Sequence, residues 1–351
     1  MICYSAQESD GIYLVLVLMV NVVSWCKNLI GIVLIAAVWG CGSKGLLTDT
    51  EVEEPATRLL TSEEKALVKM DPTTLSYEQS YDRALTLWPV PFESIEVPTS
   101  KGNAHVLVTG PENGAPLVIL HGLNASSTMW YPNIKAFSSK YRVYAIDFLL
   151  EPGKSEKKGT VLTTKGILTW YEEIFDYLKL KEFDIVGASR GGWLSINIAL
   201  NNPKRIRRMA LLSPAQTFAW IPPSSEVLTN ISFSISPKRK NLDEVLGTLS
   251  SDVKNIDQLY KDQYFIATQE MSINTAFAQM TPFNDRQFKS LRMPVLVLIG
   301  DDDFINPPES LAKAKAVLPQ AEARMVSNSG HFLSMDQAKV VNEEVLRFLR
   351  R

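Results

Sequence analysis

Cysteine and histidine are scarce in this sequence. Its three cysteines all lie within the first 41 of 351 residues. The rest of the chain can therefore form no disulfide and no cysteine-ligated metal site, and its stability must come from a hydrophobic core. The three histidines, His105, His121 and His331, leave little room for a histidine-rich zinc site.

An excess of charge of either sign is also absent. The chain has 36 lysines and arginines against 38 aspartates and glutamates, for a net charge of -2. This balance argues against a nucleic acid or a strongly acidic molecule as partner. The sequence has no internal repeat and no low-complexity tract. A chain of 351 residues is long enough for one large α/β domain with an insertion, or for two smaller domains.

The beginning of the chain holds two apolar runs, 12–23 and 29–38, with Lys27 between them. They fit either one broken membrane span or a signal sequence. A lysine in the middle of a bilayer costs about 3 kcal/mol, whereas Lys27 suits the charged region that precedes the apolar part of a signal peptide. The second run ends in a pattern that resembles a bacterial lipobox. We therefore expect residues 1–41 to be a signal peptide, with Cys41 as the site of lipidation.

Two alternatives for this segment stay open: an uncleaved membrane anchor, and a buried or artefactual extension. Met19 is a plausible true start, because acidic Glu8 and Asp10 stand where a signal peptide needs positive charge. Lipidation would hold the protein on a membrane outside the cytoplasm; the alternatives are a cytoplasmic protein and a single-span anchor. Residues 42–80 are polar, so we expect a tether with a short helix near residues 62–68.

The body of the chain alternates short apolar runs with amphipathic segments. The first two runs, near 95–97 and 105–108, predict an antiparallel pair. Six more runs, several of them fully apolar as in strands buried on both faces, lie at 117–120, 143–146, 183–186, 209–212, 295–299 and 322–326. Helical spacing is found near 130–139, 164–180, 191–202, 308–317 and 337–349. This alternation predicts an α/β fold with a mostly parallel, eight-stranded, doubly wound sheet.

The alternation breaks once, between residues 212 and 295. About residues 217–290 contain aromatic residues and methionines but no series of strands, so we expect a helical cap over the carboxyl ends of the strands. Its large apolar side chains fit either a substrate pocket or a core between helix and sheet. These side chains are Trp220, Phe233, Tyr260, Tyr264, Phe265, Phe277 and Met280.

A serine stands on a sharp bend in the stretch 184–192. The pattern Gly-x-Ser-x-Gly, formed by Gly187, Ser189 and Gly191, follows a strand-like run and precedes helical apolar spacing. A serine hydroxyl acts as a nucleophile only when it is exposed and a base removes its proton. In such an elbow the glycines let strand and helix pack closely, and the amide after the serine points at the developing oxyanion. Ser189 is therefore the candidate nucleophile, although the pattern alone is weak.

The candidate base is His331, in a turn directly after the last predicted strand. His105 fits this role less well because it lies within a predicted strand near the start of the domain, and His121 belongs to a different motif. A helix cap or a packed loop histidine is the alternative interpretation of His331. We predict that His331 takes the proton of Ser189.

Three consecutive acids follow the penultimate predicted strand. Asp303 is our choice for the residue that orients the base, because the third residue after the glycine that ends the strand is its usual place in this arrangement. Asp302 is the alternative, since sequence does not determine the register of a loop. Asp301 is expected to face solvent or to accept hydrogen bonds within the turn.

A glycine turn follows the apolar strand at 117–120. Its Gly122 allows the backbone to fold back, so that the amide of Leu123 meets the amide of Arg190 and both bind the oxyanion. His121 then serves the structure of the turn. The alternative is an ordinary glycine turn between strand and loop.

With these four motifs in place, the chain resembles the α/β-hydrolase superfamily from about residue 81 to residue 351. Segments that resemble the bacillus carboxylesterases of the naproxen-esterase (carboxylesterase NP) type lie at 87–90, 127–134, 138–142 and 333–336. The resemblance implies an α/β-hydrolase fold and a monomer-sized carboxylic ester hydrolase that uses no metal and no organic cofactor. That group can carry glutamate where Asp303 stands here. The usual superfamily turn after Asp147 is altered in this chain, so no catalytic role is assigned there.

We predict a serine hydrolase that cleaves small apolar esters through an acyl-enzyme, with a Ser-Asp-His triad. A serine nucleophile argues against haloalkane dehalogenases and epoxide hydrolases of this superfamily, which use a carboxylate. Thioesterase, aminopeptidase, perhydrolase and carbon-carbon hydrolase activities use the same triad and stay open. Two other classes are a slow-turnover receptor or signalling protein and, ranked last, a purely structural lipoprotein. The sequence specifies no oligomeric state.

Overall fold

The structure, a computed structural model, describes residues 57–159, 163–270 and 280–351. The expected signal peptide with Cys41 and the first part of the expected tether lie outside the described residues. Within the described ranges, no helix is both long enough and apolar enough to cross a membrane.

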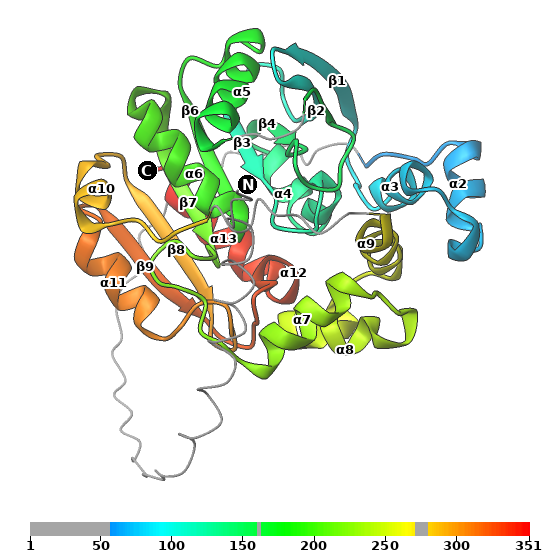
Figure 1. Cartoon of the computed structure of the whole chain (residues 1–351). Coiled ribbons are helices and arrows are strands. Elements are labelled where there is room, and N and C mark those ends of the chain that lie inside the picture. The colour runs from blue at the N-terminus through cyan, green and yellow to red at the C-terminus, as the bar shows by residue number, and fades with distance from the viewer. Residues whose placement is uncertain (1–56, 160–162, 271–279) are drawn as a thin grey trace, which may run out of the picture. The chain divides into compact units, whose positions relative to one another are not determined.

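One mixed sheet forms the centre of the described chain (Figure 1). Its strands are β1 (Phe92–Thr99), β2 (Gly102–Thr109), β3 (Ala115–Leu120), β4 (Tyr141–Ile146), β5 (Glu156–Lys157), β6 (Phe183–Ala188), β7 (Ile206–Leu212), β8 (Val295–Gly300) and β9 (Ala321–Val326). Their order is β1-β2-β4-β3-β6-β7-β8-β9, with β5 paired to β2. β2 is antiparallel to β1, β4 and β5, and the pairs from β4 to β9 are parallel.

All eight predicted strands are present, and the count of eight needs one correction. The sheet has nine strands in the described residues, because β5 adds a two-residue strand against Gly102 and Asn103 of β2. Two residues are too short to show any period of two. This strand was therefore invisible in the sequence.

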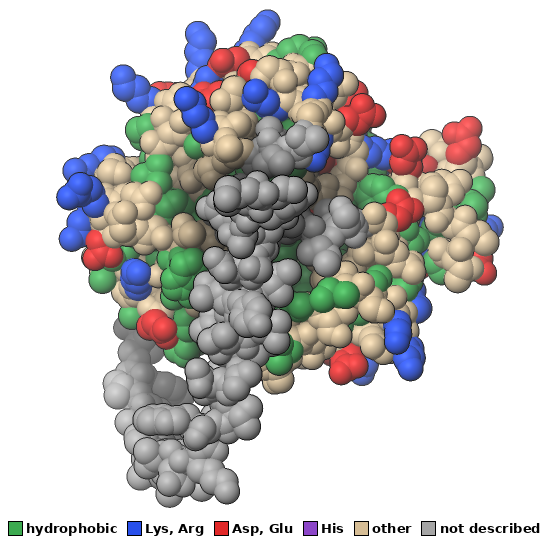
Figure 2. Space-filling view, in the orientation of Figure 1, with side chains coloured by type: hydrophobic (Ala, Val, Ile, Leu, Met, Phe, Trp, Pro, Cys, Tyr) green, Lys and Arg blue, Asp and Glu red, His purple; other side chains and the backbone are tan. Residues whose placement is uncertain are grey.

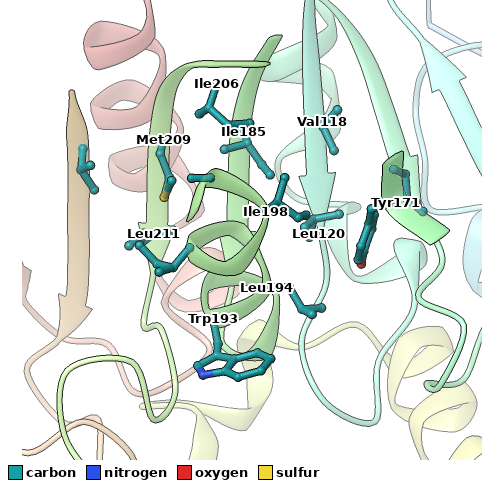
Figure 3. Packing of buried hydrophobic residues seen from close by; sticks show 14 of the residues in the cluster. Val118, Leu120, Tyr171, Ile185, Trp193, Leu194, Ile198, Ile206, Met209 and Leu211 are labelled. Carbon is teal, nitrogen blue, oxygen red and sulfur yellow. The ribbon is translucent and has the colours of Figure 1, made fainter. Parts of the chain in front are cut away.

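Helices cover both faces of the sheet. One face is covered by α5 (Thr164–Tyr177), α6 (Arg190–Asn201) and α11 (Glu309–Val317), and the other by α3 (Tyr77–Leu85), α4 (Ile134–Ser138) and α13 (Ala338–Leu349). We call the buried cluster under α5, α6 and α11 the first layer and the buried cluster under α3, α4 and α13 the second layer. Side chains of β3 alternate between them: Val118 and Leu120 lie in the first layer, whereas Leu117 and Ile119 lie in the second. Figure 3 shows α6 packed against the sheet in the first layer. Burial on both faces explains why the parallel strands read as continuous apolar runs.

The helix predicted near 130–139 is split in two. A 3-10 turn, η2 (Ser127–Trp130), precedes α4, and Pro132 lies between them. Proline lacks the amide hydrogen that a continuous helix needs there.

The segment between β7 and β8 is helical in its described part. It contains α7 (Ser225–Ile235), α8 (Leu242–Leu249), α9 (Gln258–Glu270) and α10 (Asp285–Ser290), with 3-10 turns η4 (Arg239–Asn241) and η5 (Val253–Asn255). Four of the large apolar residues predicted for the pocket or the core are buried in the second layer, namely Phe233, Tyr260, Tyr264 and Phe265. Met280 is buried in the first layer, Trp220 is 62% exposed, and Phe277 lies outside the described residues.

The chain before residue 81 is folded where the structure describes it. Helix α2 (Ser62–Val68) and the turn η1 (Pro72–Thr74) lead into α3, and Thr61 and Ser76 close capping boxes at the starts of α2 and α3. The Nη2 atom of Arg83 donates to the carbonyl of Val68 at 3.2 Å. The predicted boundary between tether and domain at residues 80 and 81 falls inside α3, so it does not mark a structural break.

Candidate active site

Ser189 stands between β6 and α6 in a backbone conformation that side chains rarely adopt, with φ 51° and ψ -117°. A Cβ atom on Gly187 would collide with the carbonyl oxygen of Gly191, and one on Gly191 would collide with that of Leu120. Strand and helix can approach this closely only because both residues are glycine. The tight bend leaves Ser189 partly exposed at the carboxyl end of β6.

Two hydrogen bonds connect Ser189, His331 and Asp303. The Oγ atom of Ser189 lies 2.8 Å from Nε2 of His331, and Nδ1 of His331 lies 2.9 Å from Oδ1 of Asp303. An ionised carboxylate can only accept, so Nδ1 carries the proton and Nε2 is free to accept from the serine. The three predicted residues come from the ends of β6, β8 and β9 and meet at one edge of the sheet.

Asp303 is held as an anion by its surroundings. Its carboxylate accepts from the amide of Ile305 at 3.0 Å and from Nδ2 of Asn306 at 2.8 Å. Burial raises the pKa of Asp303, but His331 and the side chain of Asn306 outweigh that effect, and the pKa is lowered below its usual value. Asp303 therefore stays charged next to the histidine near neutral pH.

The other two acids of this loop lie elsewhere. Asp302 is exposed, and its backbone amide donates to the carbonyl of Ser329. Asp301 accepts from the amides of Asn328 and Ser329, both at 3.0 Å, as expected of a turn acceptor. The loop register, which the sequence left open, thus puts Asp303 and not Asp302 against His331.

The His331 turn has further supports that sequence reasoning missed. Asp336 accepts from the amide of Gly330 at 2.9 Å, and the amide of Phe332 donates to the carbonyl of Leu249 at 2.7 Å. Leu249 ends α8, so the cap holds the turn that carries the histidine. Only the tertiary fold brings these partners together, because Leu249 and Phe332 are far apart in the chain.

The glycine turn after β3 approaches the nucleophile closely. A Cβ atom on Gly122 would lie 3.2 Å from the Cβ of Ser189, so a side chain there would crowd the serine. Leu123 is partly exposed, and Asn124 has a left-handed backbone with φ 53°. Arg190 is the first residue of α6, where backbone amides have no acceptor within the helix. The two amides predicted to bind an oxyanion thus belong to segments on either side of Ser189.

The other two histidines have both ring nitrogens engaged. His121 donates from Nδ1 to the carbonyl of Gly122 at 3.0 Å and accepts at Nε2 from the amide of Phe148 at 2.8 Å. Burial lowers the pKa of His121, so the ring is neutral. Within the described residues, no group of three or more histidine, cysteine, aspartate or glutamate side chains could hold a metal ion.

His105 forms a second Ser-His-Asp chain, which the sequence did not reveal. Its Nδ1 lies 2.9 Å from Oδ2 of Asp147, and its Nε2 lies 2.7 Å from Oγ of Ser94. Burial raises the pKa of Asp147, but the hydrogen bond and charge of His105 outweigh this and lower it. Ser94 lies within β1, paired with Leu107 of β2, and not at a bend between a strand and a helix. The residue types alone therefore do not make this chain a hydrolytic site.

The surface agrees with the balanced composition. Figure 2 shows basic and acidic side chains scattered among uncharged ones on the face that it draws.

Comparisons with known proteins identify the family of this chain. A family model described as alpha/beta hydrolase fold matches residues 115–236 and 239–338. The uncharacterized carboxylesterase nap of Bacillus subtilis is 33% identical over 295 residues, which cover 82% of this chain and 97% of that protein. Carboxylesterase YbfK of the same organism is 31% identical over 282 residues, 78% of this chain and 94% of the relative. The crystal structure of naproxen esterase (carboxylesterase NP) from Bacillus subtilis superposes with a TM-score of 0.73 at 33% identity, covering 80% of this chain and 99% of the other.

Proposed function

Because the chain belongs to the alpha/beta hydrolase fold family and is a carboxylesterase-type hydrolase, we propose that Ser189, His331 and Asp303 form its catalytic triad. The observation that carries this proposal is the pair of hydrogen bonds, 2.8 and 2.9 Å long, that joins these three side chains at the strained elbow. They would hydrolyse carboxylic esters through an acyl-enzyme intermediate.

In the first half of the reaction, Oγ of Ser189 attacks the ester carbonyl carbon while Nε2 of His331 takes its proton. Asp303 keeps the ring in the required tautomer and stabilises the imidazolium ion. His331 then gives the proton to the departing alcohol, which leaves the acyl group on Ser189. In the second half, the same histidine activates a water molecule that releases the acid and restores the serine.

The negative charge that develops on the carbonyl oxygen would be bound by the backbone amides of Leu123 and Arg190. Support comes from the close approach of Gly122 to Ser189 and from the position of Arg190 at the start of α6. Removing one such donor in related chemistry costs about 3 kcal/mol of transition-state stabilisation.

Small apolar esters are the proposed substrates. Support comes from the apolar character of the cap, whose residues Tyr260 and Tyr264 of α9 lie beside Asn124, the residue after Leu123. The same rings also belong to the buried core between the cap and the sheet.

A fluorophosphonate probe and turnover of p-nitrophenyl butyrate test this proposal. We expect the wild-type chain to be labelled and to turn over, and Ser189→Ala to lose labelling and about 10⁴-fold or more in kcat. Ser94→Ala is the matched control, since Ser94 also contacts a histidine that is paired with an aspartate, and it should behave as wild type. Persistent labelling of Ser189→Ala would refute the assignment.

The same experiment separates the esterase from a receptor that retains the triad. A labelled Ser189 with negligible turnover across a panel of esters would favour the receptor. Hydrolysis of thioesters, peptides or carbon-carbon bonds in preference to esters would move the substrate class within the same mechanism.

For the beginning of the chain, we propose lipidation of Cys41 and attachment to a membrane outside the cytoplasm, on the sequence pattern alone. Metabolic labelling with a radioactive fatty acid should mark the wild-type chain and not Cys41→Ser. If Cys41→Ser is still labelled, the assignment of Cys41 as the lipidation site is wrong.

A further inference from the structure

A buried carboxylate lies between the two segments that carry the proposed oxyanion donors. Glu151 belongs to the loop that follows β4, to which the sequence analysis assigned no role. Its Oε2 atom accepts from the backbone amide of Asn124 at 2.8 Å. Its Oε1 atom accepts from Nη1 of Arg190 and forms an ion pair with it. One side chain thus bridges the glycine turn and the start of α6.

Both side chains of this bridge are buried. The side chain of Glu151 is fully buried, and that of Arg190 is 2% exposed. The guanidinium group of Arg190 also lies 4.7 Å from the ring centroid of Phe148, from the same loop as Glu151. Burial raises the pKa of Glu151 above its usual value, and the neighbouring arginine and the Asn124 amide offset this effect only in part. Charges that are removed from water and bound at both ends have few alternative positions.

We propose that Glu151 is a positioning residue that sets the separation between the backbone amides of Leu123 and Arg190. Each carboxylate oxygen holds one of the two segments: Oε2 holds the residue after Leu123, and Oε1 holds the side chain of Arg190 itself. The inference rests on the proposed function, because it assigns Glu151 a role only through the oxyanion site.

The separation matters because both amides must reach one oxygen atom in the transition state. Oxyanion donors act at about 2.7–3.1 Å from that oxygen, and a displacement of about 1 Å costs on the order of 100-fold in rate. The glycine turn follows β3 and helix α6 follows β6, so the two donors belong to separate segments of the chain. The turn has no regular secondary structure of its own, and Asn124 in it has a left-handed backbone. A single bridging acceptor removes the freedom of one segment relative to the other.

Glu151→Gln tests the bridge with the smallest change in shape. The two donors bind different oxygens of the carboxylate, and a glutamine amide replaces one of these oxygens with an NH2 group that donates, so in this geometry one of the two hydrogen bonds is lost. We expect kcat on p-nitrophenyl butyrate to fall about 10- to 100-fold while KM stays within about twofold. The affinity for a trifluoromethyl ketone, which forms an oxyanion on the serine, should fall in parallel with kcat/KM.

Asp184→Asn is the matched control in the full-length chain. Asp184 is a buried carboxylate paired with Arg207 at 3.0 Å, but it lies near the start of β6, at the opposite end from Ser189. It should lose comparable stability in urea unfolding and keep wild-type kcat and ketone affinity.

Two outcomes would overturn the inference. One is a Glu151→Gln variant that keeps wild-type kcat and ketone affinity. The other is an equal loss of kcat in Asp184→Asn, which would show that any loss of stability slows the enzyme. A wild-type chain that hydrolyses no ester would instead refute the proposed function, so the two failures are distinguishable.

Discussion

Individual residues in this protein take their roles from their partners. His121 and His331 are both buried histidines, yet Nε2 of His121 accepts a hydrogen bond from a backbone amide, whereas Nε2 of His331 faces a serine hydroxyl. Ser94 and Ser189 both contact a histidine, but only Ser189 stands at an elbow beside a glycine turn. A nucleophile therefore requires the donors around it as much as its base.

The neutral His121 should make folding stability depend on pH. Its folded pKa is lowered by burial, so the unfolded chain takes up a proton below the ordinary value of 6.5 while the folded chain does not. Stability contributed by this residue is present above that pH and is lost as the pH falls toward the folded pKa, by up to about 1.4 kcal/mol per pH unit. Urea unfolding of wild type and His121→Gln between pH 7.5 and 5 should show a shallower slope in the variant. Equal slopes would contradict this origin.

Elements far apart in the sequence are joined by a few buried polar contacts. Helix α3 lies beside the cap helix α9 (Figure 1), and Nη1 of Arg83 contacts Oδ2 of Asp262 across them at 2.7 Å. Asp262 also accepts from Arg239 and from Gln258. Helix α3, which precedes the sheet, and the cap helix α9 thus stabilise each other.

Breaking this contact should destabilise the fold. Arg83→Met leaves a buried carboxylate with fewer partners, and we expect a loss of about 3 kcal/mol in the free energy of unfolding, with Arg239 limiting the damage. Asp82→Asn on the same helix removes an exposed pair with Lys154 and should cost less than about 1 kcal/mol. Urea denaturation of the two variants checks the difference, and similar losses would argue against the Arg83 contact.

In the whole domain, the site lies at the point where the order of the strands in the sheet reverses. β3 lies between β4 and β6. Gly122, two residues after β3, and Ser189, directly after β6, approach each other at this switch point. The chain then leaves the sheet for the cap and returns to supply Asp303 and His331. Segments on both sides of the cap therefore build one site.

Truncation locates the true beginning of this folded unit. Removing residues 1–56 should leave esterase activity on p-nitrophenyl butyrate and the thermal midpoint close to those of the full chain. Removing residues 1–80 cuts α3 and deletes the buried Leu75, so the midpoint should fall by more than about 5 °C. If both truncated chains unfold at the same temperature, the predicted boundary at residue 81 stands.

The fold class and most of the candidate site were readable from the sequence. Strand runs, the Gly-x-Ser-x-Gly elbow and the turn before His331 are local patterns, and each depends on residues within about ten positions of one another. The eight predicted strands lie in the sheet, and Ser189, His331 and Asp303 lie in contact.

Tertiary structure decided what depends on distant partners. The choice of Asp303 over Asp302, the second chain through His105 and the bridge at Glu151 all require contacts between residues that no local period connects. The burial of the aromatic residues of the cap was likewise decided by tertiary structure, because apolar spacing alone does not show which side chains pack against the rest of the domain. Local patterns determine which elements form, whereas loop register and buried polar pairing are set only when packing brings separate strands to the same edge of the sheet.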